Sequence, residues 1–176
     1  MNKIKSFLYL LLIASVATSC LNTETHTTPQ MLFGHLYVNP QFVGDTLVGA
    51  KDTLEDHYNY EVGMVYLDTL QLGDTVMFSA YFDSYMNSLV SVQANYDTTR
   101  VNLWFAIDPQ SDAVKNLLAS GSNPQKGILL FNPMYRSVVF PIYIVPQEAG
   151  SYPIKITVTS DSNYPTNSAI FTMPVK

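Results

Sequence analysis

Residues 152–159 read Tyr-Pro-Ile-Lys-Ile-Thr-Val-Thr and carry the clearest alternation of apolar and polar side chains in the chain. Successive side chains of a β-strand point to opposite faces of a sheet. The apolar set is Tyr152, Ile154, Ile156 and Val158, and the polar set includes Lys155, Thr157 and Thr159. This period of two predicts a strand with one buried and one solvated face.

The same alternation recurs along most of the chain. It predicts further strands over residues 62–70, 76–82, 89–96, 101–107, 128–131, 138–144 and 169–175. Pro141 cannot donate a backbone hydrogen bond, which favours an edge position or a bulge for its strand. Strands of this number, separated by turns, predict an all-β, antiparallel immunoglobulin-like sandwich of seven to nine strands. A barrel is the main alternative.

One segment, residues 111–120, has a helical pattern. Ser111 suits the N-cap, Asp112 suits the positive start of a helix, and Gly121 suits its end. The apolar residues that would share one face of this helix are Val114, Leu117 and Leu118. We therefore expect one short helix in an otherwise all-β domain.

The first nineteen residues have the pattern of a secretory signal peptide. Lys3 and Lys5 give a positive start, residues 7–13 are an unbroken apolar run, and residues 14–19 are mostly small. The apolar run is too short to cross roughly 30 Å of hydrocarbon as a helix. We therefore assign residues 1–19 to a signal peptide that is removed.

Residues 17–20, Ala-Thr-Ser-Cys, resemble a bacterial lipobox, whose cysteine is diacylated and becomes the mature N-terminus. Ala17 stands where the commonest lipobox has Leu. The resemblance implies a membrane anchor on Cys20, because acyl chains contribute about 0.8 kcal/mol per buried methylene. Leu21 is not the aspartate that retains lipoproteins in the inner membrane of enteric bacteria, which favours the outer membrane and leaves the leaflet open. An ordinary secreted protein is the alternative.

The rest of the chain divides into a tether and one domain. Residues 20–31 are polar and rich in Thr, which predicts a flexible tether, and residues 32–176 form a single predicted domain. Residues 32–61 are its least defined part, either an added strand pair or a wrapping loop.

Composition excludes several classes of protein. Of 176 residues, 47% are hydrophobic and 13% charged, which excludes a disordered chain. A single cysteine excludes an internal disulfide and a multi-cysteine zinc site. Removal of Lys3 and Lys5 with the signal peptide changes the net charge from -5 to -7. This acidic balance argues against a nucleic-acid partner.

Two stretches resemble immunoglobulin-like domains found in uncharacterised lipoproteins of Bacteroidetes-type bacteria. Residues 73–83, GDTVMFSAYFD, and residues 88–92, SLVSV, are similar to the second and third strands of such domains. Residues 148–152, EAGSY, resemble the tyrosine corner that opens the sixth strand, which implies that the hydroxyl of Tyr152 bonds to nearby backbone. Two residues depart from the antibody pattern, since Ile154 replaces a cysteine and Trp104 falls on the fourth strand instead of the third.

The sequence carries no phosphate-binding loop, G-x-S-x-G elbow, H-E-x-x-H helix or metal-spaced Cys/His set. The loops after the second and sixth strands of an immunoglobulin-like sandwich lie at one pole. Their candidate ligand-binding residues are Asp83, Tyr85, Asn87, Asp161, Asn163 and Tyr164. Aromatic rings beside amides and carboxylates suit a sugar, and the same oxygens could hold calcium, which takes six to eight oxygen ligands. The alternative is ordinary turn chemistry.

The predicted fold also places the tether. The first strand begins at the same pole, so the tether should leave there and turn this loop site toward the membrane. We expect a non-catalytic cell-envelope lipoprotein that binds or scaffolds another envelope component. A glycan-binding accessory lipoprotein of a polysaccharide-uptake system is the second hypothesis, and an envelope hydrolase using scattered carboxylates is the third.

Overall fold

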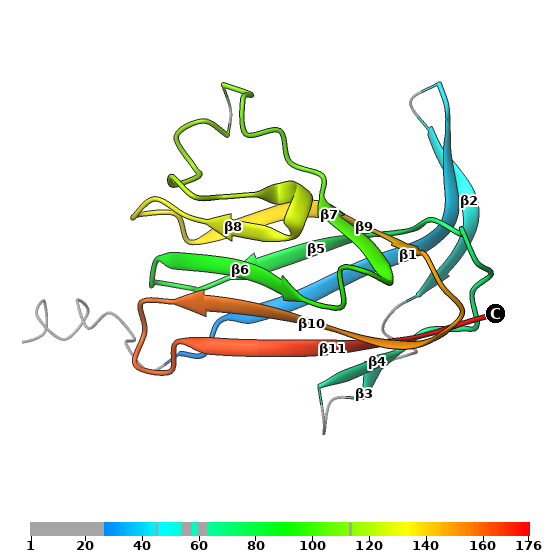
Figure 1. The fold of residues 1–176 in the computed structure, drawn as a ribbon. Coiled ribbons are helices and arrows are strands. Elements are labelled where there is room, and N and C mark those ends of the chain that lie inside the picture. The colour runs from blue at the N-terminus through cyan, green and yellow to red at the C-terminus, as the bar shows by residue number, and fades with distance from the viewer. Residues whose placement is uncertain (1–26, 45, 54–57, 60–62, 113) are drawn as a thin grey trace, which may run out of the picture.

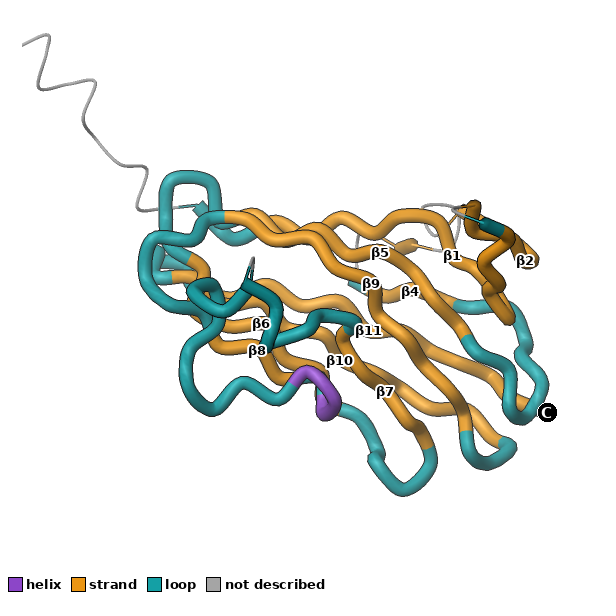
Figure 2. The backbone as a smooth tube through the Cα atoms, turned by 90° about the horizontal axis from the view of Figure 1, so that it is seen from above, coloured by secondary structure: helices purple, strands orange, loops and turns teal. Residues whose placement is uncertain are grey.

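Two β-sheets packed face to face make up the described part of the chain (Figures 1 and 2). The computed structural model describes residues 27–44, 46–53, 58–59, 63–112 and 114–176. Within these ranges, no helix is both long and apolar enough to cross a bilayer. The predicted signal peptide, Cys20 and the first part of the predicted tether lie outside the described residues.

The first sheet has the strand order β2-β1-β5-β9-β7. Its strands are β1 (Gln30–Val43), β2 (Thr46–Thr53), β5 (Val76–Asp83), β7 (Val101–Phe105) and β9 (Ser137–Pro146). All of its neighbouring strands are antiparallel.

The second sheet has the strand order β3-β4-β11-β10-β6-β8. Its strands are β3 (Tyr58–Asn59), β4 (Met64–Tyr66), β6 (Leu89–Asn95), β8 (Ile128–Leu130), β10 (Gly150–Ser160) and β11 (Thr166–Val175). The pair β4–β11 is parallel, and the other pairs of this sheet are antiparallel.

This topology is that of an immunoglobulin-like sandwich with additions. The order β1-β5-β9-β7 follows strands A, B, E and D of such domains, and β6, β10 and β11 follow C, F and G. The all-β sandwich is therefore confirmed, and residues 73–83 and 88–92 contain β5 and the start of β6, which take the places of its second and third strands. The predicted count of seven to nine strands is too low, because the described residues form eleven. Strands β2, β3, β4 and β8 extend the edges of the two sheets.

The predicted helix over residues 111–120 is wrong. Lys115 N donates to Ser111 O and Leu118 N donates to Val114 O, so only a turn of helical character forms. Leu118 then pairs with Phe131 in an antiparallel bridge beside β8. This tertiary pairing outweighs the helical pattern, because a segment this short has little helical stability of its own. A short 3-10 turn, η2 (Pro124–Lys126), forms further along the chain.

Pro141 does not lie on an edge strand. Its strand, β9, is flanked by β5 and β7. The carbonyl of Pro141 faces β7 and accepts from Ala106 N at 2.8 Å, one residue beyond the last β7 pair at Phe105. In an antiparallel strand, the N–H and C=O of one residue point to the same side. The position of the missing N–H of Pro141 therefore also faces β7, where the ladder of residue pairs between β7 and β9 has already ended.

By the alternation over residues 89–96, Val90 would lie on the same apolar face as Val92, but the structure turns it outward. It is 44% exposed, because Ser91 pairs with Thr159 while Leu89 pairs with Ser160. Val90 is thus the extra residue of a β-bulge, and the bulge turns its side chain outward.

The N-terminal part of the domain is a strand pair rather than a wrapping loop. Strand β1 begins at Gln30, two residues before the predicted domain boundary, and forms a hairpin with β2. Gln30 pairs with Asp83, so β1 is an integral strand of the first sheet and not only an addition to its edge.

The core lies between the inner faces of the two sheets, where aromatic rings from both meet. Phe78 of β5 and Phe171 of β11 are fully buried, with ring centroids 5.0 Å apart and an angle of 20° between the rings. Phe33 of β1 contacts both rings edge-on. This cluster joins strands of different sheets through apolar burial alone.

We expect Phe171→Ala to lower the free energy of unfolding by about 3–5 kcal/mol, the usual cost of removing a buried phenylalanine ring. Urea denaturation followed by circular dichroism measures this change. Val139→Ala is the control, because Val139 is 64% exposed on the first sheet and its truncation should change stability by no more than about 0.5 kcal/mol. Equal losses in the two variants would contradict the assigned core.

Candidate functional site

The structure brings together the two loops that the sequence placed at one pole. Asp161 Oδ1 accepts from Ser88 N at 2.7 Å, and Asp161 N donates to Ser88 O at 3.0 Å. The loop after β5 and the loop after β10 therefore lie side by side, at the left end of the molecule in Figure 1.

The two carboxylates of this pole are both engaged in hydrogen bonds within the fold. Asp83 Oδ1 accepts from Tyr85 N at 2.7 Å, and Asp83 Oδ2 accepts from the Tyr81 hydroxyl at 2.9 Å. That hydrogen bond to Asp83 is the main cause that raises the pKa of Tyr81. Asp83 thus stabilises its own loop, and Asp161 joins the β10–β11 loop to Ser88 of the β5–β6 loop.

The amides and rings of the pole differ in exposure. Asn87 is only 8% exposed, and its side-chain nitrogen donates to Thr27 Oγ1 at 2.9 Å and to Ser84 O at 3.2 Å. Tyr85 and Tyr164 are 45% and 59% exposed, and Asn163 is exposed as well. The pole thus presents two aromatic rings but few open carboxylate oxygens.

The start of β1 lies at this same pole, as the sequence predicts. Tyr85 donates its hydroxyl hydrogen bond to Gln30 Oε1 at 3.3 Å, and Asn167 donates to Pro29 O at 2.9 Å. Within the described ranges, no three Asp, Glu, His or Cys side chains lie close enough to hold a metal ion. Calcium binding at this pole gains no support from the geometry.

A larger hollow lies on the outer face of the second sheet, and we call it the sheet-face groove. Its floor consists of three cross-strand pairs between β6 and β10, which are Ser91–Thr159, Gln93–Thr157 and Asn95–Lys155. The groove has a volume of about 500 Å³. Hydroxyl and amide side chains and one lysine thus form a polar floor on the outer face of the central strands, in which Ser91 is largely buried.

One wall of the groove is the segment that contains η2 and β8. Lys126 and Ile128 line it, and Gly127 between them has φ 64°. A Cβ on Gly127 would lie 2.8 Å from Leu103 Cδ2 and 2.9 Å from Ala94 Cβ, so only glycine fits here. Ala94 N donates to Gly127 O at 2.8 Å, which fixes this wall against β6.

The far end of the groove opens into a second hollow of about 460 Å³, which shares Asn95, Tyr96 and Lys155 with it. The hydroxyl of Tyr96 donates to Leu103 O at 3.2 Å, and burial raises the pKa of this phenol.

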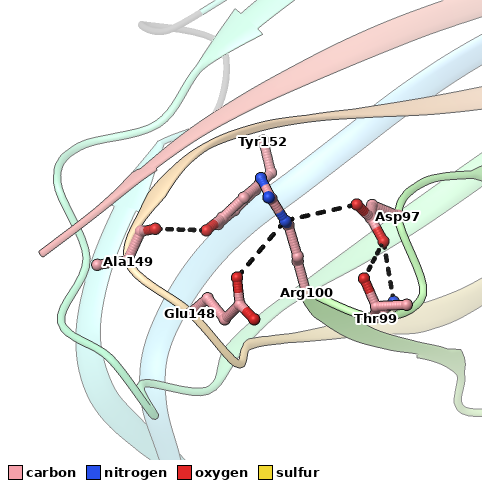
Figure 3. Close-up of polar contacts among 6 residues, drawn as sticks. All are labelled: Asp97, Thr99, Arg100, Glu148, Ala149 and Tyr152. Carbon is pink, nitrogen blue, oxygen red and sulfur yellow. Dashed lines mark hydrogen bonds and ion pairs between the residues drawn. The ribbon is translucent and has the colours of Figure 1, made fainter.

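Asp97, Arg100 and Tyr152 line this second hollow. Figure 3 shows how these residues and Glu148 lie around the Arg100 side chain. Arg100 Nε lies 3.6 Å from Asp97 Oδ2 and 3.5 Å from Glu148 Oε2, and the guanidinium stands 5.7 Å from the centre of the Tyr152 ring. The Tyr152 hydroxyl donates to Ala149 O at 2.6 Å, the backbone contact that a tyrosine corner makes.

Sequence reasoning missed the groove. The alternation over residues 152–159 did place Lys155, Thr157 and Thr159 on a solvated face. No local pattern connects them to Lys126, because that residue reaches the groove only through the pairing of β8 with β6. The groove is thus a product of strand order and not of a motif.

No family model matches this chain, and a search of the curated proteins found no match. Among solved structures, the chain is similar to part of the CaDoc0917–CaCohA2 complex, at 15% identity and a TM-score of 0.38, over 64% of this chain and 99% of that one. It is similar to a PapD-like domain of human CEP192 at 13% identity and a TM-score of 0.36, over 65% and 81%. A family 123 glycoside hydrolase from Clostridium perfringens matches at 12% identity and a TM-score of 0.38, over 85% and 27%. Scores this low carry no argument about what the chain binds.

We expect Thr99→Val to raise the pKa of Asp97 toward its ordinary value of 3.8. Hydrogen bonds from the Thr99 side chain and backbone hold the pKa of Asp97 below that value, and the hydroxyl contact is 2.6 Å. A carboxyl whose folded pKa is lowered stabilises the fold above its unfolded pKa, and this stabilisation is lost as pH falls through the folded pKa.

Carboxyl ¹³C NMR titration between pH 2 and 6 checks this expectation, a window set around the ordinary pKa of Asp. Thr98→Val is the matched control, since the neighbouring Thr98 makes no hydrogen bond to Asp97 among the contacts described. An Asp97 pKa that is the same in both variants and the parent would refute the assigned cause.

Proposed function

We propose that this protein is a non-catalytic, lipid-anchored binding module of the bacterial cell envelope, and that the sheet-face groove is its ligand site. The groove carries the proposal, because it is a polar hollow of about 500 Å³ on the outer face of the second sheet. Ligand sites typically have volumes of about 300–1,000 Å³.

The chemistry of the lining supports binding more than catalysis. The described lining of the groove consists of hydroxyl, amide, aromatic, aliphatic and lysine side chains, without a carboxylate, imidazole or thiol. Such a surface offers hydrogen bonds and positive charge, but it lacks the carboxylate pair on which the hydrolase hypothesis rests.

The position of the predicted anchor at Cys20 favours the groove over the loop pole as the ligand site. Thr27, the first described residue, contacts Asn87 at the pole of the β5–β6 and β10–β11 loops. A tether from Cys20 would therefore turn that pole toward the membrane. The groove runs along the flank of the sandwich toward the opposite end, so it stays open to a ligand beside the anchored protein.

A glycan-binding accessory role is the second candidate, favoured by a specific observation. Five of the six floor residues, all except Lys155, carry a hydroxyl or an amide that both donates and accepts hydrogen bonds. Sugar hydroxyls do the same.

We expect Cys20→Ser to abolish lipid labelling and to release the protein from the membrane fraction. The reason is that the thiol is the acylation site that the lipobox resemblance implies. Growth with an alkynyl fatty acid, followed by membrane sedimentation and immunoblotting, measures both effects. Thr23→Ser is the control and should stay labelled and sedimenting. A Cys20→Ser protein that still carried the label would overturn the anchor assignment.

Site-specific photo-crosslinking tests the ligand site itself. With benzoylphenylalanine at Gln93, on the groove floor, we expect adducts with an envelope component in living cells. Benzoylphenylalanine at Ser79 is the matched control, because Ser79 is an exposed strand position on the first sheet. Equal adduct yields at the two positions would count against the groove.

A further inference from the structure

The sheet-face groove gathers positive charge in an acidic protein. The chain carries 14 Asp and Glu against 9 Lys and Arg. Lys126 and Lys155 are nevertheless the only charged residues in the described lining of the groove. Neither ammonium group forms an ion pair with a described carboxylate. Two lysines without an ion pair to a described carboxylate thus stand around one hollow of an acidic protein.

The nearby arginine does not add to this charge. Arg100 is held between Asp97 and Glu148 at the edge of the second hollow, so two carboxylates more than balance its guanidinium (Figure 3). The favourable potential for an anion is therefore centred between Lys126 on the η2 wall and Lys155 on β10. Charges of one sign around a hollow raise the local concentration of oppositely charged ligands.

The side chains of the floor between the two lysines suit a hydroxylated ligand. Thr157 and Thr159 present hydroxyls, Gln93 and Asn95 present amides, and Ser91, which is 5% exposed, adds a largely buried hydroxyl. Gln93 Nε2 donates to Ser91 Oγ at 3.4 Å, which orients two of these groups. Each of these side chains can donate and accept at once, as a sugar hydroxyl does.

The strand order argues against a peptide in the same place. An extended peptide binds a sheet by pairing its main chain with an open strand edge. Both floor strands are already paired on two sides, β6 with β10 and β8, and β10 with β6 and β11. The backbone groups of the floor are therefore used within the sheet, and only side chains remain to bind a ligand.

We propose that the sheet-face groove binds an acidic polysaccharide, whose carboxylates pair with Lys126 and Lys155 and whose hydroxyls bond to the amides and hydroxyls of the floor. This inference rests on the proposed function, in which the groove is the ligand site. It adds the charge and the chemical class of the ligand.

Affinity electrophoresis of the full chain, solubilised in detergent, tests this proposal. Gels would contain polygalacturonate, neutral dextran or poly-L-glutamate. We expect polygalacturonate to retard the protein, dextran to have no effect, and poly-L-glutamate to bind about tenfold more weakly, because it lacks the hydroxyls. The retardation should decrease as NaCl is raised, since salt screens exposed charges.

Two double variants assign the binding to the groove. Lys126→Gln with Lys155→Gln should lower the affinity for polygalacturonate by about tenfold or more, because charge-assisted hydrogen bonds are lost. Lys115→Gln with Lys176→Gln removes the same total charge outside the groove lining and should change the affinity by less than about twofold. Tyr85→Ala with Tyr164→Ala, at the loop pole, should also leave binding unchanged.

Four results would overturn the inference: no retardation by polygalacturonate, equal losses in the two lysine variants, equal binding of poly-L-glutamate, or loss of binding in the tyrosine variant. The photo-crosslink at Gln93 tests separately whether the groove is a ligand site and whether its ligand is an acidic polysaccharide. Adducts at Gln93 without polygalacturonate binding would leave the groove as a ligand site and reject the acidic polysaccharide. Absence of both would reject the groove itself.

Discussion

The two sheets of this sandwich are held together by apolar burial without a covalent link, and most other features depend on that constraint. Ile154, which stands where antibody-type domains carry a cysteine, is fully buried, and the rings of Phe78 and Phe171 join β5 to β11. Burial stabilises by roughly 25 cal/mol for each Å² of apolar surface. Each central strand must therefore keep a continuous apolar inner face, and only its outer face is free to vary.

The outer faces of the two sheets differ in the side chains that they carry. On the second sheet, the groove-floor residues of β6 and β10 are polar, and β8 pairs with only part of β6. The segment of η2 and β8 therefore stands as a wall beside a floor of hydroxyl and amide groups. On the first sheet, Trp104 stacks on Tyr143 with ring centroids 5.0 Å apart, so its outer face is far more aromatic. This asymmetry places the polar groove on one flank of the sandwich.

Sequence reasoning succeeded wherever one strand contained its own evidence. The period of two over residues 152–159 identifies β10, and the same pattern identifies β5, β7 and β9. It failed where a partner strand decided the outcome. Leu118 leaves its helical pattern to pair with Phe131, Val90 is turned outward by a bulge opposite β10, and Pro141 sits in a central strand beside the end of β7. None of these partners is visible in the local sequence.

The sequence alone determined the alternating strands, the disulfide-free core, the meeting of the β5–β6 and β10–β11 loops, and the expectation of a lipid anchor at Cys20. These follow from residue types at short spacings, which local stereochemistry and burial convert into structure. Only the tertiary structure decided that Asp83 binds its own loop, that Asp161 binds the neighbouring loop at Ser88, and that Lys126 and Lys155 share one groove. The physical reason is that hydrogen-bond partners and charge proximity depend on strand order and register, which long-range pairing fixes and no short segment encodes.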